Sequence, residues 1–155
     1  MRKLPGSRNC FVCGRQNPKS LRLEFFYDDE AAIVQADVEL DESHEGFPGV
    51  MHGGVIAAML DEAAGRAWGD EPDRFMVTSE LKIRYRKPTP VGQKLQLKAW
   101  PSKRKGRVSW SHSELRDQSL EILAEADAVF VDIPPAQVEA MRSDADGWRV
   151  YPDEA

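Results

Sequence analysis

The chain has 155 residues, of which 41% are hydrophobic and 30% are charged. This composition is typical of a single soluble globular domain and excludes a mostly disordered chain. No apolar run reaches the roughly 18 residues that a membrane span requires, and the two cysteines are too few for a disulfide framework. The opening residues are basic but lack the apolar stretch of a secretory signal. We therefore expect a cytoplasmic protein with no membrane partner.

The net charge of −5 is unevenly distributed along the chain. Residues 1–22 contain six lysines and arginines and no acid, and residues 80–107 contain ten with a single acid, Glu80. Two basic segments in an acidic protein indicate a local anion-binding site and argue against a general nucleic-acid surface, so we expect no nucleic-acid partner. The alternative is that these side chains form the solvated faces of strands.

The first expected elements are two strands, at residues 21–28 and 31–40, where apolar and polar residues alternate. Three acids at 28–30 form the turn between them, and a loop rich in acids, glycine and proline follows over 41–49. The pattern then changes from a period of two to the period of a helix.

One long helix is expected, from about Gly54 to Gly69. The side of the helix opposite the main apolar stripe carries mostly small residues. Only Glu62 and Arg66 look suited to solvent, and their spacing of four residues is that of a helical ion pair. A helix this apolar is expected to be buried on more than one side, and the small residues let a second body approach closely. The apolar stripe consists of Val55, Ile56, Met59, Leu60, Ala63, Ala64 and Ala67.

Period-two patterns return after the helix and predict four more strands, at 81–86, 95–99, 108–112 and 121–133, with a hairpin turn at 103–107. A short helix is expected over 135–142, and residues 143–155 are expected to be loosely held. The order β-β-α-β-β-β-β with short turns predicts an α+β fold in which one curved antiparallel sheet packs on one long helix.

The segment before the long helix carries the strongest chemical signal. Gly53 and Gly54 place bare backbone N–H groups at a helix N-terminus, where these groups have no intrahelical partner and the helix dipole is positive. This arrangement suits an anion or a developing oxyanion, and the missing side chains let a carbonyl come close. The alternative is a glycine turn in which His52 caps the helix.

His-Gly-Gly at 52–54, with Asp61 nine positions after the histidine, resembles the hotdog-fold acyl-CoA thioesterases of the PaaI-like and 4-hydroxybenzoyl-CoA thioesterase-like kind. The loop His-Glu-Gly-Phe-Pro-Gly at 44–49 is similar to one branch of that superfamily, as are Thr78 and the run 81–88. The same branch has an opening similar to Cys10-Phe11-Val12-Cys13-Gly14 with Asn17-Pro18.

The likeness extends over roughly residues 10–133. It implies a hotdog domain at 21–134, preceded by an N-terminal segment at 1–20 and followed by a short helix and tail at 135–155. It also implies hydrolysis of an acyl-CoA thioester to free acid and CoA, with no metal and with no cofactor beyond the coenzyme A of the substrate.

The resemblance assigns roles to four residues. The Gly53 N–H would be the oxyanion donor and His52 would help to position the thioester. Asp61 would be either the general base for water or the nucleophile that forms an anhydride, and Thr78 would hold the water or the carboxylate. Some relatives place an asparagine six positions before the histidine, where this chain has Gly46. His44 and Glu45 are the candidates to replace that asparagine as substrate-binding residues.

The spacing of these residues has a consequence for assembly. Eight residues separate Gly53 from Asp61, which is about 12 Å along a helix. A carbonyl held at Gly53 is therefore out of reach of Asp61 in the same chain, so a shared site needs a second chain. A twofold homodimer with paired helices would supply it. Hotdog proteins form such dimers and often pair them into homotetramers.

The basic segment 80–107 has a candidate ligand in coenzyme A, which carries a diphosphate and a 3′-phosphate. Solvated strand faces are the alternative for each residue. The candidate CoA-binding residues are Gly54 at the helix start and Arg84, Arg86, Lys87, Lys103, Arg104, Lys105 and Arg107.

The rival interpretation is a non-catalytic acyl-CoA-binding protein, or a hotdog protein that modifies an acyl group in a biosynthetic pathway. Asp61 and Thr78 favour the hydrolase, and no second acid/base pair supports a hydratase. Cys10 and Cys13 supply only two of the four ligands of a structural zinc site and lack a thioredoxin-like context, so a structural pair is expected. His112 is expected in the core or at an interface.

Overall fold

The computed structural model describes residues 1–71, 74–142 and 148–150. Its main elements follow the expected order: two strands come before the long helix, and four strands and a short helix come after it. The elements are β1 (Arg2–Lys3), β2 (Phe26–Asp28), β3 (Ile33–Val38), a 3-10 turn η1 (Glu42–His44), β4 (Glu45–Phe47), β5 (Val50–Met51), α1 (Gly53–Gly65), β6 (Met76–Tyr85), β7 (Leu95–Lys105), β8 (Val108–Arg116), β9 (Ile122–Asp132) and α2 (Pro135–Arg142).

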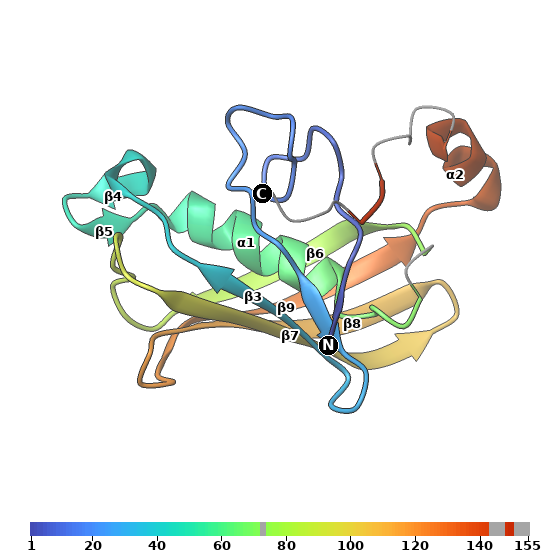
Figure 1. The fold of residues 1–155 in the computed structure, drawn as a ribbon. Helices are drawn as coiled ribbons and strands as arrows, with labels where there is room; N and C mark the ends of the chain where they lie inside the picture. The colour runs from blue at the N-terminus through green and yellow to red at the C-terminus, as the bar shows by residue number, and fades with distance from the viewer. Residues whose placement is uncertain (72–73, 143–147, 151–155) are drawn as a thin grey trace.

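The large sheet has seven strands in the order β1-β2-β3-β7-β8-β9-β6, and every neighbouring pair is antiparallel. Figure 1 shows the sheet curving around α1, which lies across one face. Strand β6 is at the edge and pairs with β9 alone in the described sheet. The expected α+β architecture, a curved antiparallel sheet around one long helix, is confirmed.

The core lies between α1 and the inner face of the sheet. Met59, Leu60 and Ala63 of the helix are fully buried against small and aliphatic residues of β7, β8 and β9. Three serines of β8 also face inward, and the Ser113 hydroxyl donates to the Leu60 carbonyl at 2.9 Å. The helix is therefore fixed to the sheet by one buried polar contact as well as by apolar packing. The inward serines are Ser109, Ser111 and Ser113.

The N-terminal segment covers the other side of α1, so the helix lies between two layers (Figure 1). Arg66, just after the helix, donates to the Pro5 carbonyl at 2.5 Å and pairs with Glu62 at 2.7 Å. The predicted ion pair is confirmed. The prediction that Arg66 is solvated is wrong, because the covering segment leaves Arg66 only 8% exposed.

Several boundaries differ from the sequence prediction. The first strand is regular only over Phe26–Asp28, although its alternating residues are buried as expected. Strand β7 continues to Lys105, so the predicted turn at 103–107 contracts to Gly106 and Arg107, where Gly106 has a φ of +60°. His112 is half-buried on the outer face of β8, not in the core, because the alternate positions of that strand face the helix.

The C-terminal part begins with the predicted helix over Pro135–Arg142, which is confirmed. Most of the predicted loose tail lies outside the described residues. Within the described part, Arg149 forms a backbone bridge with Gly6, and Trp148 packs on Phe75 with ring centroids 5.6 Å apart. For residues 148–150 the expectation of a loosely held tail is therefore wrong. No helix in the described ranges has the length and apolar character needed to cross a bilayer.

Candidate functional site at the two halves of helix α1

The N-terminus of α1 is capped by a histidine. His52 has extended backbone angles, φ −62° and ψ 133°, and its Nδ1 accepts a hydrogen bond from the Gly54 N–H at 2.8 Å. Because Nδ1 is an acceptor, the neutral ring carries its proton on Nε2. The cap interpretation of His52 is therefore confirmed, and it engages the Gly54 amide. No residue in the described part of the chain accepts from the Gly53 N–H, which is left open at the positive end of the helix.

The loop before the helix is held by its own side chains. The His44 ring contacts Asp41 at 3.1 Å, and Glu45 Oε1 accepts from the Gly49 N–H at 2.7 Å. A side chain at position 46 would begin 3.2 Å from the His52 Cα. Position 46 therefore lies directly beside the capping histidine, whereas the polar groups of His44 and Glu45 are used within the loop.

Tyr85 is a part of this region that the sequence did not indicate. Its hydroxyl donates to the Gly53 carbonyl at 2.8 Å, which attaches the end of β6 to the helix start. A groove of about 550 Å³ opens here, and Phe47, Tyr85, Arg86 and Lys87 belong to its walls. In the sequence Tyr85 appears only as one more apolar position of a strand, so no signal distinguished it.

Asp61 lies two turns further along α1, facing the start of β6. The Thr78 hydroxyl donates to Asp61 Oδ1 at 2.8 Å. Thr78 stands at an irregularity in the pairing of β6 with β9, between Thr78 and Glu80. Burial raises the pKa of the Asp61 carboxyl, and the hydrogen bond from Thr78 acts in the opposite direction. The structure thus brings together the acid and the hydroxyl that the sequence suggested as a pair.

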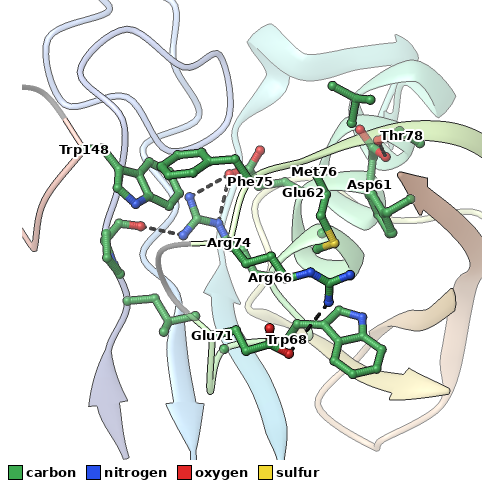
Figure 2. A pocket seen from close by; sticks show the side chains of 16 residues that line it. Asp61, Glu62, Arg66, Trp68, Glu71, Arg74, Phe75, Met76, Thr78 and Trp148 are labelled. Carbon is green, nitrogen blue, oxygen red and sulfur yellow. Dashed lines mark hydrogen bonds and ion pairs between the residues drawn. The ribbon is translucent and has the colours of Figure 1, made fainter. Parts of the chain in front are cut away.

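Asp61 and Thr78 form one end of a cavity of about 400 Å³. Figure 2 shows them facing each other, with the tilted ring pair of Phe75 and Trp148 at the opposite end. The Trp68 indole N–H donates to the Ser111 hydroxyl at 3.2 Å, which fixes that ring in the wall. The other walls are mainly apolar and aromatic, and Arg66 and Arg74 also line the cavity. The serines at every second position of β8 could have indicated this hydrogen bond to Trp68, but they were not singled out from the sequence.

The two chemical groups lie far apart within one chain. Strand β6 touches both, through Thr78 at Asp61 and through Tyr85 at Gly53. Seven residues separate Thr78 from Tyr85, about 23 Å along an extended strand. The strand path is longer than the 12 Å estimated along the helix, and both estimates place the two groups beyond contact within one chain. The described chain therefore presents a backbone donor and a carboxylate at separate places.

The basic candidates divide into two groups. Arg84, Arg86 and Lys87 lie toward the Gly53 end and pair with acids of the β8–β9 hairpin, Asp127, Glu125 and Glu121 respectively. The remaining four lie at the β7–β8 hairpin: Lys103 covers Trp110, Arg104 pairs with Glu71, Arg107 donates to the Asp132 carbonyl, and Lys105 pairs with no acid in the described residues.

Two clusters of side chains in the described ranges contain possible metal ligands. One consists of Cys10, Cys13 and Glu62, and the other of His112, Glu114 and Glu125. His112 Nδ1 also contacts Asp127 at 2.7 Å. Neither cluster includes Asp61, Thr78 or Gly53.

Known proteins share both the sequence and the fold. Acyl-coenzyme A thioesterase THEM4 of Bos taurus is 28% identical over 92 residues, 59% of this chain and 37% of that protein. THEM4 of Xenopus laevis is 32% identical over 92 residues, 59% of this chain and 41% of that protein. The chain thus spans about two fifths of the length of these curated relatives.

The solved structure of protein RHA08564, a thioesterase superfamily protein, is 28% identical, with a TM-score of 0.73 over 80% of this chain and 63% of that chain. A family model described as "Thioesterase superfamily" matches residues 48–124, which include the capping His52, helix α1, Asp61 and Thr78. Together with the fold, this match places the chain in the thioesterase superfamily, as a member with the hotdog fold.

Proposed function

We propose that the chain hydrolyses an acyl-CoA thioester to the free acid and CoA. The observation that carries the proposal is Asp61: a half-buried carboxylate, oriented by Thr78, in the wall of a cavity large enough for an acyl group. The open Gly53 N–H supplies the second requirement, a backbone donor at a helix N-terminus. The activity in the names of the THEM4 relatives supports the same reaction.

The chemistry follows from these groups. The thioester oxygen accepts from the Gly53 N–H, which stabilises the negative charge that develops on it. A water attacks the carbonyl carbon and passes a proton to Asp61, the C–S bond breaks, and the proton leaves with the CoA thiolate. In the alternative route Asp61 attacks the carbonyl itself and water hydrolyses the resulting anhydride. Thr78 orients the carboxylate in either route, since its hydrogen bond occupies one side of Oδ1.

The separation of the two groups leads to a site shared between two copies of the chain. Three apolar side chains near the unpaired edge of β6 support such a dimer: Phe47 is 79% exposed, and Val77 and Tyr85 are each 54% exposed. Mixing Gly53→Pro protein with Asp61→Ala protein under conditions of subunit exchange should restore part of the activity. Full activity in a verified stable monomer would contradict the shared site.

A panel of acyl-CoAs with different acyl groups, assayed by thiol release, tests the proposal directly. At least one substrate should be turned over by the wild-type protein and not by Asp61→Asn. The rival function, acyl-CoA binding without hydrolysis, is supported by saturable binding of the same panel with no thiol release. A loss of both binding and hydrolysis across the panel would contradict both functions.

A further inference from the structure

The N-terminal segment contains a tight turn that brings two thiols together. The Gly14 N–H donates to the Cys10 carbonyl at 2.9 Å, and a Cβ at position 14 would lie 2.3 Å from that oxygen. Only glycine fits such an approach. The turn places the sulfurs of Cys10 and Cys13 within 4.8 Å of each other, beside Glu62 of α1. The hydrolysis reaction uses none of these three side chains.

The two sulfurs have different surroundings. Cys10 is partly exposed, whereas Cys13 is 4% exposed. Cys10 Sγ accepts from the N–H groups of Val12 at 3.3 Å and Cys13 at 3.5 Å. The Cys13 thiol also donates to it, and these bonds hold the pKa of Cys10 at about 6 against burial and the nearby Glu62 carboxylate. The same hydrogen bond and burial raise the pKa of Cys13.

A side-chain cation already pairs with two of the three possible metal ligands. Arg66 donates to Glu62 Oε1 at 2.7 and 2.9 Å and to Cys13 Sγ at 3.1 Å. In the described part of the chain only three potential ligands gather here, and a structural zinc ion takes four. The cluster is therefore better suited to chemistry of the thiols themselves than to holding an ion.

We propose that Cys10 and Cys13 form a reversible dithiol–disulfide site. The partly exposed Cys10 thiolate attacks a small disulfide such as oxidised glutathione, which gives a mixed disulfide and releases one glutathione thiolate. Cys13 then loses its proton to solvent and attacks the Cys10 sulfur, and the second glutathione leaves. Two protein thiols are oxidised to one disulfide, and one glutathione disulfide is reduced to two glutathione thiols.

Oxidation of this pair reaches the acyl cavity through Arg66. The guanidinium that contacts Cys13 Sγ also holds Glu62 and lies 5.1 Å from the Trp148 ring, and all three of these residues line the cavity that contains Asp61. In the disulfide the Cys13 sulfur is a weaker hydrogen-bond acceptor and lies closer to Cys10. The contact between Arg66 and the Cys13 sulfur therefore weakens. The expected effect on turnover rests on the proposed hydrolysis, whereas disulfide formation does not.

The test exposes the whole protein to oxidised glutathione and measures intact mass. Wild-type protein should lose two hydrogens, and reductant should restore them. Cys13→Ser keeps a hydrogen-bond donor beside Cys10 and should stop at one bound glutathione, whereas Cys10→Ser should bind none. At pH 6, Cys10 in folded Cys13→Ser should react several-fold faster than in the same variant unfolded by guanidinium, because the serine hydroxyl and the N–H groups of residues 12 and 13 stabilise its thiolate in the fold. If the serine variant does not fold, Cys13→Ala replaces it for the mass measurement alone, because alanine lacks the hydrogen-bond donor.

Fluorescence and turnover measure the coupling. Oxidation should change the tryptophan emission of the wild type and leave that of Trp148→Phe unchanged. It should also change KM for the best acyl-CoA reversibly in the wild type. A Cys10→Ser/Cys13→Ser variant should show no such change in KM. A wild type that stays reduced, equal glutathione uptake by the two single variants, or one equivalent of bound zinc in the purified protein would each overturn the dithiol site. A disulfide that forms without a change in emission would overturn the coupling between the thiols and the cavity. If no substrate is hydrolysed, the intact mass alone still decides whether the dithiol site exists.

Discussion

The first turn and the middle of helix α1 offer opposite kinds of chemistry. At the first turn the functional group is the backbone: Gly53 has no side chain, its N–H is open, and His52 and Tyr85 hold the amide and carbonyl groups around it. In the middle the functional group is a side chain: Asp61 is half-buried, supported by Thr78, and faces a cavity. One half can stabilise a negative charge and the other can remove a proton.

The difference explains why neither half is sufficient. A backbone donor at a helix N-terminus needs access, so it lies in an open groove. A carboxylate with a raised pKa needs partial burial, which the second layer and β6 supply. The helix separates the two by about 12 Å. In the proposed dimer a second copy brings them to one thioester, and each prediction below separates the contributions of the two halves.

The largest effect is expected at Asp61. Asp61→Asn retains the shape of the side chain and an oxygen that accepts from Thr78, but it removes the base or nucleophile. General base catalysis typically contributes 10²–10⁴-fold, so kcat should fall by about that range with a smaller change in KM. Steady-state thiol release on the best substrate measures this. Unchanged turnover with an unchanged oligomeric state would make Asp61 structural and favour the binding function.

Stability is the control for that variant. Burial raises the pKa of Asp61 in the folded chain above its unfolded value, so the ionised carboxylate destabilises the fold above the folded pKa. This penalty disappears as the pH falls below the unfolded pKa, about 4. Asp61→Asn should therefore have a Tm at pH 7 equal to or above that of the wild type, with any gain lost near pH 4. A lower Tm at pH 7 would point to a lost structural contact.

The next effect is expected at the first turn. Gly53→Pro removes one N–H and little else, because proline is favoured at the first helical position and His52 already has the extended angles of a residue before proline. Loss of an oxyanion donor costs about 10²–10³ in kcat. Gly53→Ala keeps the N–H and is the matched control, with its Cβ in ordinary contact with Tyr85 at 3.5 Å. Equal losses in both variants would assign the effect to crowding.

Thr78 should have a smaller effect, with a distinct pH signature. Activity requires ionised Asp61, so it falls as the pH drops through the Asp61 pKa. The Thr78 hydrogen bond lowers that pKa, so Thr78→Ala should move the acid limb of the kcat profile to higher pH and reduce kcat by about tenfold. Thr78→Ser retains the hydroxyl and should restore the limb. An unmoved limb in Thr78→Ala would separate the hydroxyl from Asp61.

Local patterns in the sequence were sufficient for the parts of the fold that depend on local spacing. The helical stripe predicted a buried α1. Alternation predicted an inward row of β9, in which Ile122 is only partly buried and the other four residues are buried: Ala124, Ala126, Ala128 and Phe130. The approximate helix length gave the separation of Gly53 from Asp61, and the apolar neighbours of Asp61 predicted its half-buried setting. These features arise from residues that are close in sequence.

The missed features depend on contacts between distant segments. Arg66 appeared solvated because the residues that cover it, Pro5 and Cys13, lie more than 50 positions earlier. Trp148 closes the cavity from a segment expected to be loose. Alternate positions of β8 are serines, which would ordinarily face solvent. Their hydroxyls instead face inward, where Ser111 accepts from Trp68 and Ser109 accepts from Arg74. The alternating serines of β8 were visible in the sequence, but their spacing does not show which distant side chains they contact.

The smallest effect is expected where charge is exposed. Arg104→Glu/Lys105→Glu should raise KM for acyl-CoA by about five- to tenfold, since an exposed ion pair contributes up to about 1 kcal/mol. A pantetheine thioester lacks the nucleotide phosphates and should be nearly unaffected. Added salt should weaken only the acyl-CoA reaction, because charges are screened over about 10 Å at 0.1 M. Arg86→Glu/Lys87→Glu is the matched pair at the Gly53 groove, where both cations pair with acids as Arg104 does with Glu71. If the hairpin variant affects both substrates equally while the groove variant discriminates between them, the phosphates bind beside Gly53, at Arg86 or Lys87.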